Sequence, residues 1–219
     1  MVVNYLARHA EARRTVAAIV RAGGAATAVA ADVSEARQAR ALVAEAVALY
    51  GRLDILVNNA GIWERGPLLT LTPAAWARML AVNLDGVFHT TQAAARVMRR
   101  QGGGRIVNVS STAGQRGEAF HSHYAATKGA VISLTKSWAV ELARHGIVVN
   151  CVAPGWVDTE MTAAALAGAE RRAIERAIPL GRVGTARDVA AAILFLASDA
   201  CGFVAGEILN VNGGAVLVG

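Results

Sequence analysis

Short apolar runs alternate along the whole chain with longer segments in which apolar residues recur at helical spacing. Many of the runs are rich in β-branched residues, as expected of strands buried on both faces of a parallel sheet. Strands are expected at Val2–Tyr5, Ala26–Ala31, Leu53–Asn58, Arg105–Ser110, Ile147–Ala153 and Glu207–Val211. Helices are expected at about Arg8–Ala22, Glu35–Tyr50, Pro73–Arg100, Ser122–His145 and Ala186–Ala197. The alternation predicts an α/β fold, a parallel sheet between two layers of helices.

Several of these helices carry end signals. Ser34 and Thr72 are suitable N-caps, and Pro73 fits the first turn after Thr72. Glycines that suit helix stops follow four of them, at Gly23-Gly24, Gly51, Gly102 to Gly104 and Gly146. No repeat, linker or composition break interrupts the 219 residues, so we expect one domain over residues 1–219.

Composition excludes several classes of protein. The chain is 54% hydrophobic, yet no run reaches the roughly 18–20 apolar residues of a membrane span. The N-terminus lacks a signal-peptide pattern, and Cys151 and Cys201 stand far apart, which favours a reducing cytoplasm. His121 and His123 alternate without a further ligand nearby, so no metal site is expected.

The net charge of +6 does not indicate a nucleic-acid-binding protein. The arginines are scattered along the expected helices, without interleaved aromatic residues or a binding motif. A basic rim at Arg99, Arg100 and Arg105 remains available for an acidic partner such as a carrier protein.

The clearest candidate chemistry is Tyr124 followed four residues later by Lys128. At this spacing the two side chains share one helix face, and an ammonium beside a phenol lowers the phenol pKa towards that of a general acid. By itself the pair is common. Thirteen residues upstream, however, Ser111 ends an expected strand, and Asn83 interrupts an apolar helical pattern.

Two further strands end in small or polar residues, at Asn58-Asn59-Ala60-Gly61 and at Pro154-Gly155. Open α/β sheets bind ligands at the carboxyl ends of their strands. The ordered set NNAG, Asn, SS, YxxxK and PG resembles the short-chain dehydrogenase/reductase family, in its compact form with Rossmann topology. The resemblance extends from Val2 to the C-terminal Gly206 to Gly214 segment, and among its members 3-oxoacyl-acyl-carrier-protein reductases are the most similar.

The resemblance implies a catalytic group of Asn83, Ser111, Tyr124 and Lys128. Tyr124 would donate a proton to the substrate carbonyl, and Ser111 would hydrogen-bond the same oxygen. Lys128 would lower the Tyr124 pKa and hold the nicotinamide ribose, while Asn83 would anchor a water that relays protons. Other cofactor contacts would come from Asp32 and Val33 at the adenine, Asn58, Ala60 and Gly61 at the adenosine, and Pro154, Gly155, Val157 and Thr159 at the carboxamide.

The cofactor is expected to be NADP(H), with NAD(H) still open. An acidic residue after the second family strand would select NAD by binding the ribose 2′-hydroxyl. This chain has Asn4 and Tyr5 there, with Arg8 nearby to hold a 2′-phosphate.

The family normally opens with a strand, a TGxxxGxG turn and a helix that holds the pyrophosphate, and this sequence has none of them. Roughly thirty residues of a strand–helix unit are therefore absent. In the family strand order 3-2-1-4-5-6-7, the missing strand is a central one. The Val2 and Ala26 strands should lose their link to the rest of the sheet, and NADPH binding should be poor. Either the assigned start lies too late or the chain is truncated; the intact downstream positions favour the first.

The substrate is left open by the sequence. A 3-oxoacyl substrate, a sugar, a polyol or another secondary alcohol all fit, and an inactive scaffold is the alternative of another class. Selectivity would rest on Gln115 to His123 and on Glu160 to Pro179, a surface helix pair or a lid. Phe120 and Trp156 either line an apolar pocket or pack. The resemblance also implies a homotetramer built from the helices that carry Asn83 and Tyr124 and from the C-terminal strand.

Overall fold

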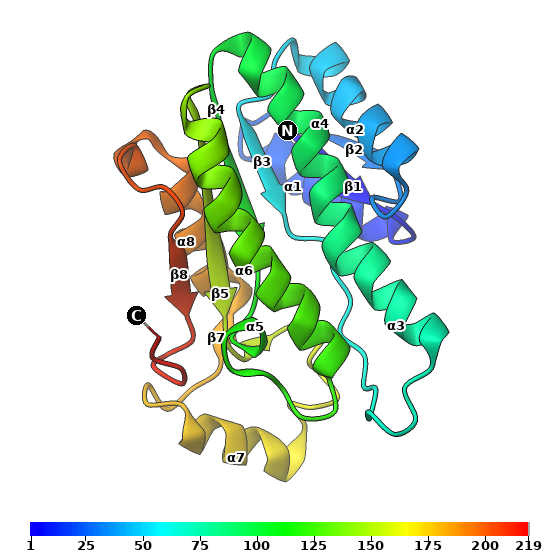
Figure 1. The fold of residues 1–219 in the computed structure, drawn as a ribbon, viewed down its shortest axis with the longest axis vertical. Coiled ribbons are helices and arrows are strands. Elements are labelled where there is room, and N and C mark those ends of the chain that lie inside the picture. Colours follow the sequence, from blue (N-terminus) through cyan, green and yellow to red (C-terminus); the bar gives the residue numbers. More distant parts are fainter. Residues whose placement is uncertain (219) are drawn as a thin grey trace.

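The computed structural model describes residues 1–218, whose centre is a four-stranded parallel sheet (Figure 1). The strands stand in the order β3-β4-β5-β8, and all three pairings between them are parallel. Their bounds are β3 Ile55–Asn58, β4 Gly104–Val109, β5 Ile147–Pro154 and β8 Ile208–Val211. Each lies within about two residues of its predicted position, because a buried valine-rich run has few alternatives to a central strand.

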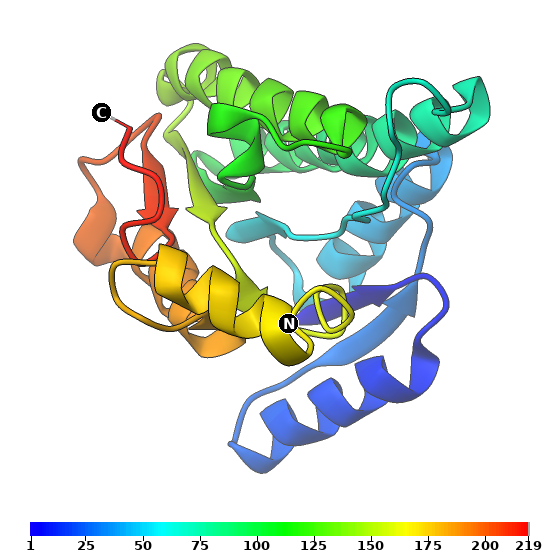
Figure 2. The same cartoon turned by 90° about the horizontal axis from the view of Figure 1, so that it is seen from below.

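Helices cover both faces of this sheet, as the alternating pattern predicted. Figure 2 shows α4 and α6 side by side over one face and α8 on the other. On one face, Met98 of α4 packs with Ile106 and Ile147 of the sheet. On the other face, Leu196 of α8 packs with Val107 of the sheet. The helices are α2 Ala36–Tyr50, α3 Pro73–Leu80, α4 Gly86–Gln101, α5 Ala113–Arg116, α6 Ser122–Ala143, α7 Gly168–Ala177 and α8 Ala186–Ala197.

The first two strands form a separate sheet. β1 (Val2–Tyr5) pairs in parallel with β2 (Thr27–Ala30), α1 (His9–Arg21) packs on them, and neither strand is hydrogen-bonded to β3. The edge of β3 is correspondingly open, with Ile55 46% and Val57 39% exposed. This confirms the predicted break: the two apolar strands β1 and β3 each present an edge that no strand of the described chain occupies.

Two local predictions were wrong. Ser34 is not an N-cap; α2 starts after Glu35, and the Ser34 hydroxyl instead donates to Asp32 Oδ1 at 2.6 Å. The single helix expected from Pro73 is interrupted by a π-helical turn at Ala81–Asp85, although Thr72 caps it as expected. The Asp32 carboxylate competed successfully for Ser34, which a pattern of capping residues does not reveal.

The segment between β5 and α8 holds the short pair β6 (Val157–Asp158) and β7 (Gly184–Thr185) and the helix α7. α7 lies beyond the carboxyl ends of β5 and β8 (Figure 1), where the lid interpretation had placed it. A 3-10 turn, Asp199–Cys201, follows α8. Among residues 1–218, no helix is both long and apolar enough to cross a membrane. That the chain forms one domain stays a prediction.

Candidate active site

Ser111 and Tyr124 meet at the carboxyl end of β4. The chain leaves β4 at Ser110, turns through α5, and starts α6 two residues before Tyr124. The Ser111 side chain lies close enough to the Tyr124 phenol to lower its pKa. Gly114 makes this turn possible: a Cβ at this position would lie 2.5 Å from the Lys128 carbonyl carbon, so only glycine lets α5 press against α6.

The Tyr124 phenol has a higher pKa than the sequence predicted. Burial raises the pKa of Tyr124 to about 12, the hydrogen bond from Ser111 opposes that shift, and the charge of Glu118 adds to it. The expected lowering by Lys128 is absent, and the Lys128 Nζ lies 5.7 Å from the centroid of the Tyr124 ring. At neutral pH the phenol is therefore protonated and available as a donor.

Lys128 is a buried lysine with spare hydrogen-bond donors. Its side chain reaches inward from α6, the residue is 5% exposed, and Nζ donates to the Val109 carbonyl oxygen at 2.8 Å. An ammonium has three donors, and Val109 is its one acceptor among residues 1–218. Burial lowers the pKa of Lys128 to about 8.

Replacing Lys128 with methionine should stabilise the fold while abolishing its chemistry. Because the pKa of Lys128 in the folded state lies below the ordinary lysine value of 10.5, the folded state binds this proton less tightly than the unfolded chain does. The buried charge therefore lowers the free energy of unfolding below pH 8, and this destabilisation fades as the pH rises towards 10.5. A pKa difference of one corresponds to about 1.4 kcal/mol, so removing the charged group should raise the free energy of unfolding by up to roughly 3 kcal/mol at pH 7. Urea unfolding of Lys128→Met at pH 7 and pH 10 measures this.

Lys136→Met is the matched control, because Lys136 lies on the same helix and is exposed. It should change the free energy of unfolding by less than about 0.5 kcal/mol. A Lys128→Met protein that is less stable than the parent at pH 7 would contradict the assignment of a desolvated cation.

Asn83 occupies the π-helical turn and is fully buried. Its Oδ1 accepts from the Ile62 N–H at 2.8 Å, and its Nδ2 donates to the Ile62 carbonyl at 2.8 Å. A Cβ on Gly61 would lie 3.2 Å from Asn83 Oδ1 and 3.7 Å from Lys128 Nζ, so the three residues converge. Asn83 thus ties the loop after β3 to the π-helical turn; its role as a water anchor stays a prediction.

The Asn58 side chain is engaged in hydrogen bonds within the protein, and its contact with a cofactor stays a prediction. Its Nδ2 donates to Thr91 Oγ1 and to Asn108 Oδ1, both at 2.8 Å, and its Oδ1 accepts from Thr90 Oγ1 at 2.7 Å. Asn108 continues this buried network to Thr135 at 2.9 Å. The network fastens β3 and β4 to α4 and α6, and sequence reasoning missed it because its members lie far apart in the chain. Ala60, by contrast, is exposed at the end of β3.

The second predicted set follows β5. Gly155 donates its N–H to Val211 at 3.0 Å, and a Cβ there would lie 2.9 Å from Asn212 Cβ. Pro154 accepts from the Thr112 N–H at 2.9 Å, which places it beside the Ser111 turn. Val157 lies in β6, and Thr159 is exposed with its hydroxyl 3.2 Å from that of Thr162.

The residues expected at the adenosine end lie on the separate sheet and just after it. Asn4 donates to the Ala31 carbonyl at 3.0 Å, and the Tyr5 hydroxyl lies 2.7 Å from His9 Nδ1. Arg8 forms an ion pair with Glu160. Asp32 accepts from Ser34, and the Val33 side chain packs over Gly86, where a Cβ would lie 3.1 Å away.

These residues fit one half of a pyridine dinucleotide. The spare donors of the buried Lys128 match the hydroxyls of a ribose, and Gly61 leaves space beside them. The sequence contains no glycine-rich turn at a helix N-terminus that would hold a pyrophosphate. The surroundings of Lys128 therefore suit the ribose of the nicotinamide half.

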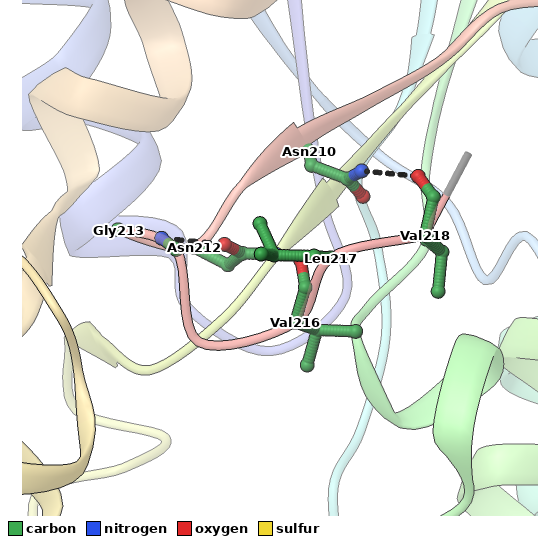
Figure 3. Close-up of a pocket in the computed structure, with 7 residues that line it drawn as sticks. Asn210, Asn212, Gly213, Val216, Leu217 and Val218 are labelled. Carbon is green, nitrogen blue, oxygen red and sulfur yellow. Dashed lines mark hydrogen bonds between the residues drawn. The ribbon is translucent and has the colours of Figure 1, made fainter.

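The pocket in Figure 3 is a different feature. It has a volume of about 460 Å³ and is formed by the C-terminal turn after β8, where Asn210 donates to Val218 at 3.4 Å and Gly214 to Asn212 at 2.9 Å. None of the catalytic residues lines it. The basic rim lies at the other end of the sheet: Arg105 is at the start of β4, about 13 Å from the carboxyl end of that strand at roughly 3.3 Å per residue.

Trp63, which the sequence did not single out, joins the predicted pocket residue Trp156 in an aromatic group at the carboxyl end of the sheet. Trp63, two residues after Gly61, stacks on His121 and meets Trp156 edge to face. Phe120 is exposed, adopts a φ of +65°, and carries the Arg65 guanidinium 4.7 Å above its ring. A tryptophan in a loop has no periodicity, so no pattern in the sequence could have indicated Trp63.

Known proteins match this chain over nearly its whole length. The family model described as "Enoyl-(Acyl carrier protein) reductase" matches residues 1–216. The 3-oxoacyl-[acyl-carrier-protein] reductase FabG of Thermotoga maritima is 44% identical over 85% of this chain and 75% of its own length. A 3-oxoacyl-[acyl-carrier-protein] reductase of Synechocystis is 40% identical over 99% of this chain and 87% of its own.

A solved structure agrees with these relatives. The gluconate 5-dehydrogenase of Burkholderia cenocepacia, in complex with NADP and tartrate, superposes with a TM-score of 0.92 at 40% identity. The match covers 98% of this chain and 84% of that one. The chain therefore belongs to the short-chain dehydrogenase/reductase family, oxidoreductases that act on CH–OH groups, as its ordered motifs predicted.

Proposed function

We propose that this chain reduces the ketone of a 3-oxoacyl substrate to a secondary alcohol with NADPH. The observation that carries the proposal is the convergence of the Ser111 and Tyr124 side chains at the carboxyl end of β4, with the buried Lys128 one helical turn after Tyr124. The 3-oxoacyl-[acyl-carrier-protein] reductases, which are 40–44% identical to this chain, support the substrate class. The neighbouring structure with bound NADP supports the cofactor.

The proton in this reaction comes from Tyr124. When bound, the nicotinamide supplies the hydride to the carbonyl carbon. Ser111 donates a hydrogen bond to the carbonyl oxygen and positions it, and the Tyr124 phenol transfers its proton to that oxygen as the alcohol forms. A phenol with a pKa of about 12 is protonated at neutral pH, which suits reduction better than oxidation. Lys128 would hold the ribose hydroxyls, and Asn83 keeps the neighbouring loop in place.

A second candidate is the oxidation of a sugar acid or polyol, favoured by the 40% identity with the gluconate 5-dehydrogenase. The rates of NADPH consumption with an acetoacetyl thioester and of NADPH formation with gluconate separate the two. We expect the first rate to be at least about tenfold higher in kcat/KM, the scale on which a polar group in the wrong pocket is rejected. A higher rate with gluconate would contradict our proposal, and no rate with any substrate would favour the inactive scaffold.

The assembly proposed is a homotetramer in the cytoplasm. β8 is an edge strand of the main sheet, and apolar side chains on α6 and near the C-terminus face solvent, with Val140 82% exposed and Leu217 88% exposed. Such patches commonly mark subunit contacts. We also propose that a carrier protein delivers the acyl group. Arg105 lies at the opposite end of β4 from Ser111, so the basic rim does not support a carrier-protein docking site beside Ser111 and Tyr124.

A further inference from the structure

Two tryptophan side chains meet across the end of β4. Trp63 belongs to the loop after β3 and Trp156 to the turn after β5, and β4 stands between these strands in the sheet. Their ring centroids are 5.9 Å apart with an interplanar angle of 88°. Strands two positions apart are separated by about 10 Å, so the two indoles reach towards each other over β4.

The Trp63 ring is held from several sides. The His121 ring stacks on the Trp63 ring with the centroids 4.5 Å apart and an interplanar angle of 9°. The Trp63 Nε1–H donates to Glu118 Oε1 at 3.2 Å. His121 Nδ1 lies 3.4 Å from the same oxygen. Offset and edge-to-face aromatic contacts each add about 0.5–1.5 kcal/mol beyond burial elsewhere, so the arrangement is well fixed.

The loops that carry these side chains are locked together as well. The Gly66 N–H donates to the Phe120 carbonyl at 2.7 Å, and a Cβ on Gly66 would lie 2.8 Å from the buried His123 ring. Phe120 keeps a positive φ, a conformation that persists only where the surroundings impose it. The loop after β3 therefore cannot swing away without breaking contacts with the segment that precedes Tyr124.

This aromatic group lies next to the reacting hydroxyls. β4 continues directly into Ser111, and His121 stands three residues before Tyr124 at the start of α6. The charge of Glu118, which anchors Trp63, is close enough to the phenol to raise the Tyr124 pKa. The Trp63–Trp156 pair thus stands at the same end of β4 as Ser111 and Tyr124.

We infer that Trp63 and Trp156 form a rigid roof over Ser111 and Tyr124 that restricts the enzyme to compact carbonyl substrates. This rests on the proposed function and refines it: the substrate is a short-chain 3-oxoacyl thioester, and long acyl chains are excluded by size. A roof fixed by stacking and by the Glu118 hydrogen bond cannot move aside to seat additional methylenes.

The test compares acetoacetyl and 3-oxodecanoyl thioesters of N-acetylcysteamine as substrates with NADPH. We expect the parent to favour the short thioester, and Trp63→Ala to shift the kcat/KM ratio towards the long one by about tenfold or more, the scale of one unseated methylene. Trp76→Ala is the matched control, because this indole lies on α3 and is exposed; its ratio should stay at the parent value. Trp63→Phe, which keeps a ring, should shift the ratio less in the same direction.

Binding of the matching 3-hydroxyacyl thioesters in the presence of NADP⁺, measured by calorimetry, separates two kinds of failure. If turnover occurs and neither Trp63 variant changes the chain-length ratio, the roof is overturned and the proposed reduction stands. If no thioester is reduced but Trp63→Phe shifts the binding ratio towards the long ligand, the roof stands and the proposed reduction fails. A parent chain that handles both lengths equally overturns the roof directly.

Discussion

Tyr124→Phe should lower kcat for carbonyl reduction by about 10²–10⁴-fold, the usual contribution of a positioned general acid. The ring stays in place, so packing around α6 is retained, and what is lost is the phenolic proton and the interaction of the hydroxyl with Ser111. Since the pKa of Tyr124 is about 12, no other protonation state of this residue contributes at neutral pH. Initial rates of NADPH oxidation with an acetoacetyl thioester measure the effect.

Tyr50→Phe is the control for this experiment. The Tyr50 hydroxyl lies 3.0 Å from Thr27 Oγ1 and donates to the Met1 carbonyl at 3.2 Å, both remote from Ser111. Removing this hydroxyl should lower the free energy of unfolding by no more than about 1 kcal/mol and leave kcat unchanged. A Tyr124→Phe protein that keeps more than about a tenth of the parent rate would remove Tyr124 from the role of proton donor.

A chimera should bind NADPH at least about a hundredfold more tightly than the 219-residue chain. It carries the strand, TGxxxGxG turn and helix of a 3-oxoacyl reductase ahead of Met1. The helix N-terminus would offer N–H donors to the pyrophosphate, and hydrogen bonds to charged groups contribute about 1.5–3 kcal/mol each, so two suffice for this gain. The added strand has a place beside β3, where Ile55 and Val57 are exposed. A fluorescence titration with NADPH compares the two proteins.

The same chimera with alanines in place of the turn glycines is the matched control. It should recover the stability that comes from covering the edge of β3, measured by urea unfolding, without recovering NADPH affinity, because a Cβ keeps the backbone away from the phosphates. Micromolar NADPH affinity of the 219-residue chain by itself would show that another segment holds the pyrophosphate and that our reasoning about the missing turn is wrong.

The elements of the fold were predictable because their signals are local. The valine-rich runs at β4 and β5 are short and bounded by turns, and the structure places them where the sequence did. Failures arose where two local signals competed, as at Ser34, or where a long apolar pattern concealed a change of hydrogen-bonding, as at Ala81–Asp85. A π-helical turn changes the backbone ladder by one residue, and the apolar pattern does not register it.

The family could be inferred from the sequence, because its ordered motifs are visible in the chain itself. The catalytic group was predicted from the same motifs and stays a prediction. The break between β1 and β3 was predictable too, from strand order. Only the tertiary structure decided how the site behaves. Burial, which depends on packing from every direction, sets the Tyr124 pKa above its ordinary value and that of Lys128 below it. Contacts between residues far apart in the chain placed the Asn58 side chain in a buried hydrogen-bond network and brought Trp63 to Trp156.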